Sequence, residues 1–284
     1  MRLGYRVILG LLCSTAIGVV AYRRQSLSRS GVLGAVLVGT ASFCAHWVWG
    51  LLLITFFVLS SLLSHFRASA KEDLAEKFAK GSQRDLGQAM ANAGVGAAIA
   101  LLYLAWPDPI LWAAFAGSMA AVNADTWATE LGVLSKRPPR LITSWRVVEA
   151  GTSGGVSFAG TLATAAGALS IGLAAVVLLL VDGLLGGSGN RQLGSDGILG
   201  GVMLLPSALI GGLAGSLVDS LLGATVQGIY HSASRGKDTE RRIDPDGTPN
   251  KLVRGWPWLG NDLVNATSSL VGALVGAAIW SWVW

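Results

Sequence analysis

The chain has 284 residues, of which 52% are hydrophobic and only 13% are charged, and its net charge is +5. Soluble domains carry about 25% charged residues, so this composition excludes an ordinary soluble enzyme and indicates a polytopic membrane protein. The positive net charge does not indicate a nucleic-acid partner, because the basic residues lie in short segments between apolar runs, as membrane topology requires.

The apolar runs predict eight membrane-spanning helices, because a spanning helix needs roughly 20 such residues. In chain order they cover about 3–21, 31–47, 48–66, 92–106, 110–130, 154–181, 198–228 and 262–284. The first run is long and ends in YRR without an A-x-A cleavage site, so it is interpreted as a retained helix. The predicted fold class is all-α, a transmembrane helix bundle forming a single integral membrane domain over 1–284.

The distribution of basic residues predicts the orientation of this bundle. If the helices alternate, then 22–30, 67–91, 131–150 and 229–261 share one side, and they carry 18 of the 21 Lys and Arg residues. The positive-inside rule makes that side cytoplasmic and places both termini on the non-cytoplasmic side.

The two longest of the predicted cytoplasmic segments, 67–91 and 229–261, differ in character. From Lys71, KEDLAEKFAKGSQRDLGQAMANAG has alternating charge at helical spacing, which predicts an amphipathic interfacial helix leading into the fourth span. From His231, HSASRGKDTERRIDPDGTPNKLVRGWPWLG is rich in Pro, Gly and charge, which predicts a loop.

Two carboxylates, Asp125 and Glu130, occur in NADTWATELG at the end of the fifth span. A charged residue inside a span costs about 2.5–3.5 kcal/mol at mid-helix, so it suggests a functional site. The alternative is that such residues only hydrogen-bond neighbouring helices. At about 100° per residue the two lie about 140° apart, so both could hold one ion only if the helix ends or bends near Gly132.

Further polar clusters border the same predicted membrane side. GTSGGVSFAGT, from Gly151, has small residues and helix-start amides suited to cradling a phosphate, and basic residues precede it. GSLVDSLLGATVQ places Asp219, Gly223 and Gln227 in one helical stripe. The other polar residues of these clusters are Lys136, Arg137, Arg140 and Arg146 before the glycines, Arg84, Asp85, Gln88 and Asn92 entering the fourth span, and Asn261, Asp262 and Asn265 opening the last span.

The types of these side chains limit the chemistry of the predicted site. Carboxylates and amide oxygens are hard ligands suited to Mg²⁺, whereas the three histidines are scattered, which makes zinc a poor candidate. Basic residues around acidic ones suit an anionic phosphate substrate. The chain has no G-x-x-x-x-G-K-[ST] and no G-x-G-x-x-G motif, so no common soluble nucleotide-binding fold is indicated.

Several of these stretches resemble one family of integral membrane proteins. NADTWATELG, RVVEAGTSGGVSFAGTLA, GSLVDSLLGATVQ and WLGNDLVNATSSLVGA, with the earlier LSRSGVLGAVLVGT and RDLGQAMANAG, are similar to the family of plant phytyl-phosphate kinase and vertebrate transmembrane protein 19. The likeness covers nearly the whole chain, and the middle motifs agree in order and spacing.

A more distant resemblance links the chain to membrane enzymes that use CTP, namely phosphatidate cytidylyltransferase and the dolichol and phytol kinases. Asp125-Thr126-x-Ala128 is similar to their Asp-Thr-x-Ala motif, and the stretch from Gly215 to Ser220 resembles their Gly-Asp-Leu-x-Glu-Ser element. Asp219 stands at the position of the Glu, and Ser216 replaces the metal-binding Asp. The Pro-Gly-His-Gly-Gly element of the cytidylyltransferases is missing, which argues against cytidylyl transfer to phosphatidate.

The resemblance implies a membrane kinase that transfers a phosphoryl group from CTP or another nucleoside triphosphate to an isoprenyl monophosphate, with Mg²⁺. Asp125, Glu130 and Asp219 are the expected catalytic residues. The expected metal ligands are Asp125, Asp219, Asn261, Asp262 and Asn265. The expected substrate and phosphate contacts are Arg84, Asn92, Lys136, Arg140, Arg146, Gly151, Thr152, Gly154, Gly155 and Gln227.

Three alternatives stay open at this point: a CTP-dependent cytidylyltransferase for a membrane lipid, a transporter whose ion path uses the same acids, and a non-catalytic membrane organiser. The expected partners are the lipid substrate, the nucleotide and the membrane, without nucleic acid, and a homodimer stays open beside a monomer. The expected location is a membrane, which is the inner or plasma membrane if the source is prokaryotic, with the active site facing the cytoplasm.

Overall fold

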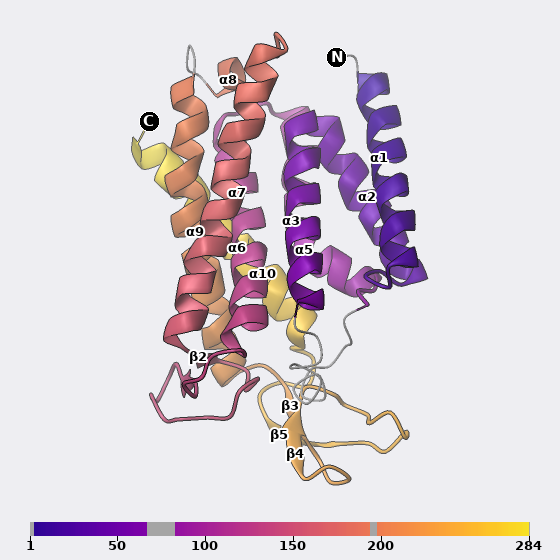
Figure 1. Cartoon of the computed structure of the whole chain (residues 1–284), viewed down its shortest axis with the longest axis vertical. Helices are drawn as coiled ribbons and strands as arrows, with labels where there is room; N and C mark the ends of the chain where they lie inside the picture. The colour runs from indigo at the N-terminus through magenta and orange to yellow at the C-terminus, as the bar shows by residue number, and fades with distance from the viewer. Residues whose placement is uncertain (1–2, 67–82, 194–197, 284) are drawn as a thin grey trace.

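The computed structural model describes residues 3–66, 83–193 and 198–283, and within these ranges eight long helices form one bundle (Figure 1). They are α1 (Leu3–Arg23), α2 (Arg29–Ala45), α3 (Trp47–His65), α5 (Leu86–Ala105), α6 (Ile110–Gly132), α7 (Phe158–Leu184), α9 (Ile198–Thr225) and α10 (Asn261–Val283). A four-residue helix, α8 (Gly189–Gln192), precedes α9. The predicted helical membrane bundle is confirmed. The first half of the amphipathic helix predicted from Lys71, residues 71–82, lies outside the described part.

Six of these helices, α1, α3, α5, α7, α9 and α10, are long and apolar enough to cross a membrane, and α2 is a shorter apolar helix. The connections on either side of β2 and the strands β3 to β5 lie at one end of the bundle, whereas α8 and the start of α1 lie toward the other (Figure 1). The alternation of the spans across the membrane and the assignment of the strand-bearing end to the cytoplasm stay predictions.

Helix ends differ from the predicted spans where side chains cap the backbone. The helix α5 begins at Leu86 and not at 92, because the Gln88 N–H donates to Asp85 Oδ1 (2.8 Å) while the Asp85 N–H donates to Gln88 Oε1 (3.1 Å). This reciprocal capping box satisfies two otherwise unpaired backbone groups. The helix α7 begins at Phe158, where Ser157 Oγ accepts the N–H of Gly160 (3.0 Å).

The segment predicted as a loop from His231 contains a small antiparallel sheet, so that prediction was wrong in part. The strands are β3 (Ile229–Ser232), β4 (Lys237–Thr239) and β5 (Lys251–Arg254), in the order β4-β3-β5. Gly236, with φ of 61°, donates its N–H to the Ser232 carbonyl and lets the chain reverse between β3 and β4. A second pair, β1 (Arg140–Leu141) with β2 (Gly155–Val156), precedes α7.

Asp244 fixes the long connection between β4 and β5. Its carboxylate accepts hydrogen bonds from Ser232 Oγ (2.5 Å), Asn250 Nδ2 (3.0 Å) and Ser234 Oγ (2.8 Å), and the residue is 4% exposed. These donors stabilise the anion, and they hold the pKa of Asp244 at about 2.

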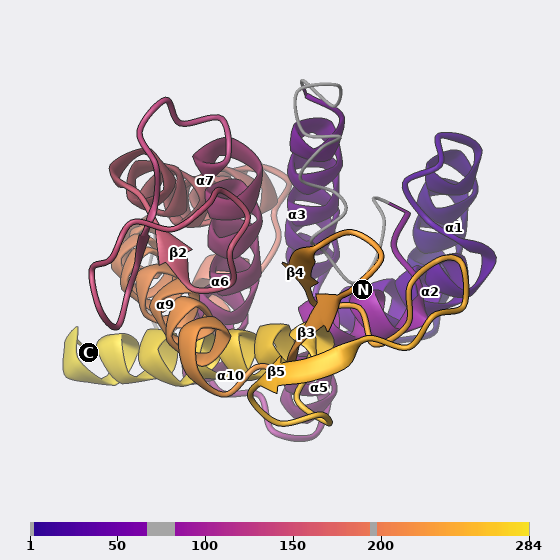
Figure 2. The same ribbon diagram turned by 90° about the horizontal axis from the view of Figure 1, so that it is seen from below.

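The helix α6 lies at the centre of the bundle, where it packs against α7, α9 and α10. Every residue from Trp112 to Ala124 is buried. Three backbones meet at its midpoint, because a Cβ on Gly117 would collide with the carbonyl oxygen of Gly272, and one on Gly211 would lie 2.7 Å from the same oxygen. Only residues without a side chain allow this approach. Figure 2 shows α10 crossing the bundle at a steep tilt to the other helices.

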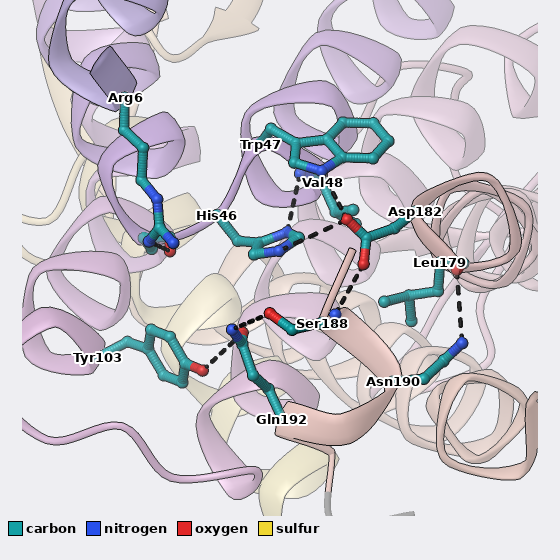
Figure 3. A network of polar contacts seen from close by, with 12 residues as sticks. Arg6, His46, Trp47, Val48, Tyr103, Leu179, Asp182, Ser188, Asn190 and Gln192 are labelled. Atoms are coloured by element: carbon teal, nitrogen blue, oxygen red, sulfur yellow. Dashed lines mark hydrogen bonds and ion pairs between the residues drawn. The ribbon is translucent and has the colours of Figure 1, made fainter. Parts of the chain in front are cut away.

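A buried polar network ties the helices together at the end away from the strands (Figure 3). Asp182 of α7, which is 2% exposed, accepts hydrogen bonds from Trp47 Nε1 (2.7 Å) and from the N–H of Gly189 (2.7 Å). His46, the single residue between α2 and α3, accepts the N–H of Val48 at Nδ1, and its Nε2 lies 3.7 Å from Asp182 Oδ1. The network therefore joins the α2–α3 turn to the end of α7 and the start of α8.

Candidate functional site

A cavity of about 990 Å³ opens at the strand-bearing end of the bundle. Its walls come from the ends of α6 and α9, the starts of α5, α7 and α10, and the connections before α7 and after β4. Twelve of the site residues expected from the sequence line it: Arg84, Asn92, Asp125, Glu130, Gly151, Thr152, Gly154, Gly155, Asp219, Gln227, Asn261 and Asp262. The fold thus brings together residues that are spread over almost 180 positions.

Three acidic residues form the floor of this cavity. Asp125 of α6, Asp219 of α9 and Glu240 after β4 lie close enough to interact electrostatically. Asp219 Oδ2 is closed off from solvent and has no hydrogen-bond partner among the described residues. A buried carboxylate oxygen without a donor is costly, and the neighbouring acids add repulsion, so the arrangement favours a bound cation.

Glu240 was not predicted from the sequence. Its Oε1 accepts hydrogen bonds from Ser153 Oγ (2.9 Å) and from Gln227 Nε2 (2.9 Å), and Gln227 is 2% exposed. The stretch Thr239-Glu240-Arg241-Arg242 was interpreted as part of a solvated loop. Its one signal in the sequence was a run of three charged residues, which sequence alone does not separate from surface charge.

Glu130 also lines the cavity, but the contacts described for it are with α3 and Arg84. Its Oε1 accepts a hydrogen bond from Ser64 Oγ of α3 (2.6 Å), and its charge stabilises that of Arg84. The predicted angular separation of Asp125 and Glu130 agrees with this division, since each contacts different neighbours. Glu130 is therefore placed to hold the cation Arg84 and not to share an ion with Asp125.

Arg84 is fixed at the wall formed by the start of α5. Its N–H donates to the Ser26 carbonyl (3.0 Å) and its carbonyl accepts the N–H of Ser28 (2.9 Å), so the α1–α2 turn holds its backbone. The guanidinium carbon lies 5.8 Å from the centre of the Phe56 ring, within the range of a cation–π contact. This geometry presents a positive charge to the cavity.

The glycine turn before α7 lines the cavity but differs from the expected phosphate cradle. It precedes the helix, which begins three residues after Gly155. The N–H of Thr152 donates to the Glu149 carbonyl, and the N–H of Gly155 donates to the Thr152 carbonyl, so these two amides serve the turn. Gly154, with φ of 82°, packs against Ala224 of α9, where a Cβ would not fit.

Four expected residues do not line the cavity. Lys136, Arg140 and Arg146 are exposed in the connection between α6 and α7, and Arg140 Nη1 donates to the Trp145 carbonyl (2.8 Å). Of the Lys and Arg residues that the structure describes, Arg84, Arg241 and Arg242 line the cavity. Asn265 does not line the cavity, and its Nδ2 donates a hydrogen bond to Oδ1 of Asn92, which does (3.1 Å).

The donor set fits one hard divalent cation held only in part by the protein. Among the described residues, no three Asp, Glu, His or Cys side chains come together closely enough to hold a metal by themselves. Asp125 and Asp219 could supply two carboxylates, with Asn261 and Asp262 also at the cavity wall. Mg²⁺ usually binds through one or two carboxylates and completes its shell with water and substrate phosphates, so this set suits it.

Comparison with known proteins gives matches over most of the chain. The profile of the family described as Integral membrane protein DUF92 matches residues 12–273. Protein PGR of Arabidopsis thaliana is 34% identical over 281 residues, which cover 94% of this chain and 93% of that protein. An uncharacterized membrane protein of Methanocaldococcus jannaschii is 28% identical, over 97% of this chain and 94% of its own length.

A third relative is Protein VTE6, chloroplastic, of Arabidopsis thaliana, which is 26% identical over 88% of this chain and 64% of its own length. No solved structure matches the chain. The family profile and the full-length similarity to Protein PGR agree with the resemblance read from the motifs. The chain belongs to the DUF92 family of integral membrane proteins.

Proposed function

We propose that this protein is a membrane kinase that transfers the terminal phosphoryl group of CTP, or another nucleoside triphosphate, to an isoprenyl monophosphate. The products are the isoprenyl diphosphate and the nucleoside diphosphate. The observation that carries the proposal is one large cavity in which Asp125, Asp219 and Glu240 lie together with Arg84, Arg241 and Arg242 at one end of a helical membrane bundle. The resemblance to the family of phytyl-phosphate kinase, with Protein VTE6 among the relatives, supports the same reading.

The charges of the cavity suit two anionic reactants. Phosphoryl transfer depends mainly on positioning the two phosphates and neutralising charge on the transferred group, and the acceptor is already an anion that needs little help from a base. Arg84 would hold the lipid phosphate, and Arg241 and Arg242 would hold the nucleotide. A bound Mg²⁺ would supply charge neutralisation between the phosphates, with Asp125 and Asp219 as its protein ligands.

The position of the acids disfavours transport as the function. An ion path needs polar groups that continue through the membrane. Here the described acidic residues of the cavity gather at one end, and the centre of the bundle is closed by the packed glycines of α6, α9 and α10. We place this end at the cytoplasm because it carries most of the basic residues.

A panel of isoprenyl monophosphates, each offered with CTP, ATP, GTP or UTP and Mg²⁺ in detergent, tests the proposal. Mass spectrometry of the products should find an isoprenyl diphosphate and one equivalent of nucleoside diphosphate. A nucleoside-diphosphate lipid with released pyrophosphate would identify a cytidylyltransferase instead. Absence of any nucleotide-dependent lipid product across the panel would reject a kinase.

A further inference from the structure

A second, smaller cavity of about 60 Å³ lies between α1, α2, α3 and α5. Apolar residues form most of its wall, and Arg84 is the one charged residue among the described residues that line it. We call this cavity the lipid slot. The residues of the slot are Ser14, Ile17, Leu27, Ala35, Val38, Gly39, Leu53, Ile54, Phe56, Phe57, Arg84, Gln88, Ala89, Asn92 and Ala93.

The lipid slot borders the large polar cavity. Arg84, Gln88 and Asn92 line both spaces. Gln88 and Asn92 are four apart, so they lie on one face of α5, and Arg84 lies two residues before the helix. The three residues form the common wall. An apolar space and an acidic, metal-suited space therefore meet at a single guanidinium group.

Both the charge and the size of the slot indicate its occupant. A cavity needs roughly 10–15 Å³ of this kind of volume to hold one water-sized group. The slot, at about 60 Å³, therefore has room for about four to six such groups. That is the size of one five-carbon unit of an isoprenoid chain. A longer chain could continue into the bilayer, because α1 and α2 stand at the edge of the bundle (Figure 1) and Leu33 and Leu37 of α2 are each 54% exposed.

We propose that the lipid slot binds the isoprenoid unit next to the phosphate of a lipid monophosphate, with that phosphate held by Arg84 at the border with the polar cavity. This inference rests on the proposed function for the identity of the lipid. Phe56 and Phe57 serve two roles in this arrangement, since they form the apolar wall and their rings lie 5.8 and 5.9 Å from the Arg84 guanidinium.

Ala35 offers a way to fill the slot. It lies on α2 in the slot wall and is half-buried, so Ala35→Phe places a ring in the space and Ala35→Leu a smaller group. The matched control is Ala98→Phe on α5, because Ala98 is exposed on its helix and lines neither cavity. Arg84→Ala removes the proposed phosphate contact and leaves the apolar wall in place.

The test is photo-cross-linking with farnesyl monophosphate that carries a diazirine in the unit next to the phosphate. Mass spectrometry should find the label on slot residues of α2, α3 or α5, and excess unlabelled farnesyl monophosphate should compete. Ala35→Phe and Arg84→Ala should each reduce labelling at least tenfold, whereas Ala98→Phe should label like the wild type. If Ala35→Phe does not elute as a folded protein, Ala35→Leu with its smaller expected loss takes its place.

Turnover of the same lipid by the same preparation separates this inference from the proposed function. Labelling of the slot without turnover supports the lipid site and rejects the kinase. Turnover with the label on α7, α9 or α10, or with labelling unchanged in the Ala35 variants, overturns the lipid slot and leaves the kinase standing. If neither labelling of the slot nor turnover is observed, both the lipid slot and the kinase function are rejected.

Discussion

Ser153 Oγ, in the glycine turn before α7, donates a hydrogen bond of 2.9 Å to Glu240 Oε1, in the connection after β4. The two residues lie 87 positions apart, on segments outside the helices. Their contact joins the glycine turn to the connection after β4 at the wall of the cavity, and Glu240 there interacts electrostatically with Asp125 and Asp219. The site therefore combines acidic residues from the helices α6 and α9 with one from a segment outside the helices.

We predict that Glu240→Gln lowers turnover by about 10- to 100-fold, because it removes one charge from the acidic group and changes the partners of Gln227. The control is Asp238→Asn, two residues earlier, whose carboxylate faces solvent and pairs with His231 at the surface. Steady-state rates with saturating lipid and nucleotide provide the comparison. Equal activity of the Glu240 variant and the wild type would remove Glu240 from the site.

Asp219→Asn should abolish turnover, with a loss of at least about 100-fold, because a carboxylate that binds the metal cannot be replaced by a neutral amide. The same change should raise the thermal midpoint of the metal-free protein, since it removes repulsion at a buried and unpaired oxygen. Asp246→Asn in the exposed β4–β5 connection is the control for both measurements. A purely structural Asp219 would give a lower midpoint with residual activity.

The contact of α6, α9 and α10 at Gly117 should not accept even one methyl group. Gly117→Ala should cost about 1–3 kcal/mol, because its Cβ would collide with the Gly272 carbonyl and force the two backbones apart. Gly94→Ala on α5 is the matched control, since its Cβ would meet nothing closer than Met90 at 3.4 Å. Thermal unfolding in detergent gives the midpoint of each variant. Equal midpoints for Gly117→Ala and Gly94→Ala would contradict the close packing.

Asp182 should act on stability and not on catalysis, because the network in Figure 3 lies at the end of the bundle away from the cavity. Asp182→Asn replaces one acceptor oxygen by an amide and should cost about 1–3 kcal/mol, as for other buried groups left unsatisfied. Asp108→Asn keeps its cap of the Ile110 N–H and serves as the control. A changed KM for nucleotide in the Asp182 variant would refute this separation.

The connection between β4 and β5 should open in acid in a defined range of pH. The folded pKa of Asp244 is about 2, below the unfolded value of about 3.9, so its contribution to stability is complete above the unfolded value. It is lost as the pH falls through the folded value. Pepsin should therefore cleave this connection in Asp244→Asn at pH 4 but spare the wild type, and the difference should shrink toward pH 2. Equal cleavage at pH 4 would contradict the role of Asp244.

The sequence predicted the helices well because apolar runs of spanning length leave few alternatives. It placed the start of the fourth span at 92, whereas the capping box of Asp85 and Gln88 begins α5 at Leu86, within the stretch predicted as an amphipathic helix. It missed β3 to β5 because these strands are three or four residues long and are stabilised by contacts such as those of Asp244.

Some residues of the candidate site were likewise predicted from the sequence and others were not. Asp125 and Asp219 stood out because charge is rare inside apolar runs, and the fold brings them together. The basic residues were harder to assign. Lys136, Arg140 and Arg146 precede the glycine turn in sequence yet are exposed, whereas Arg241 and Arg242 come from a distant segment that the small sheet folds back over the cavity. Closeness to the glycine turn in the sequence therefore did not predict which basic residues line the cavity.

The most direct test follows one phosphorus atom. Purified protein in detergent is given Mg²⁺, an isoprenyl monophosphate and CTP labelled either at its terminal phosphate or at the phosphate next to the ribose. The account predicts that only the terminal label reaches the lipid, in an amount equal to the CDP released, and that Asp219→Asn stops the transfer. Lipid labelled from the inner phosphate, or no labelled lipid while the protein remains folded, would contradict it.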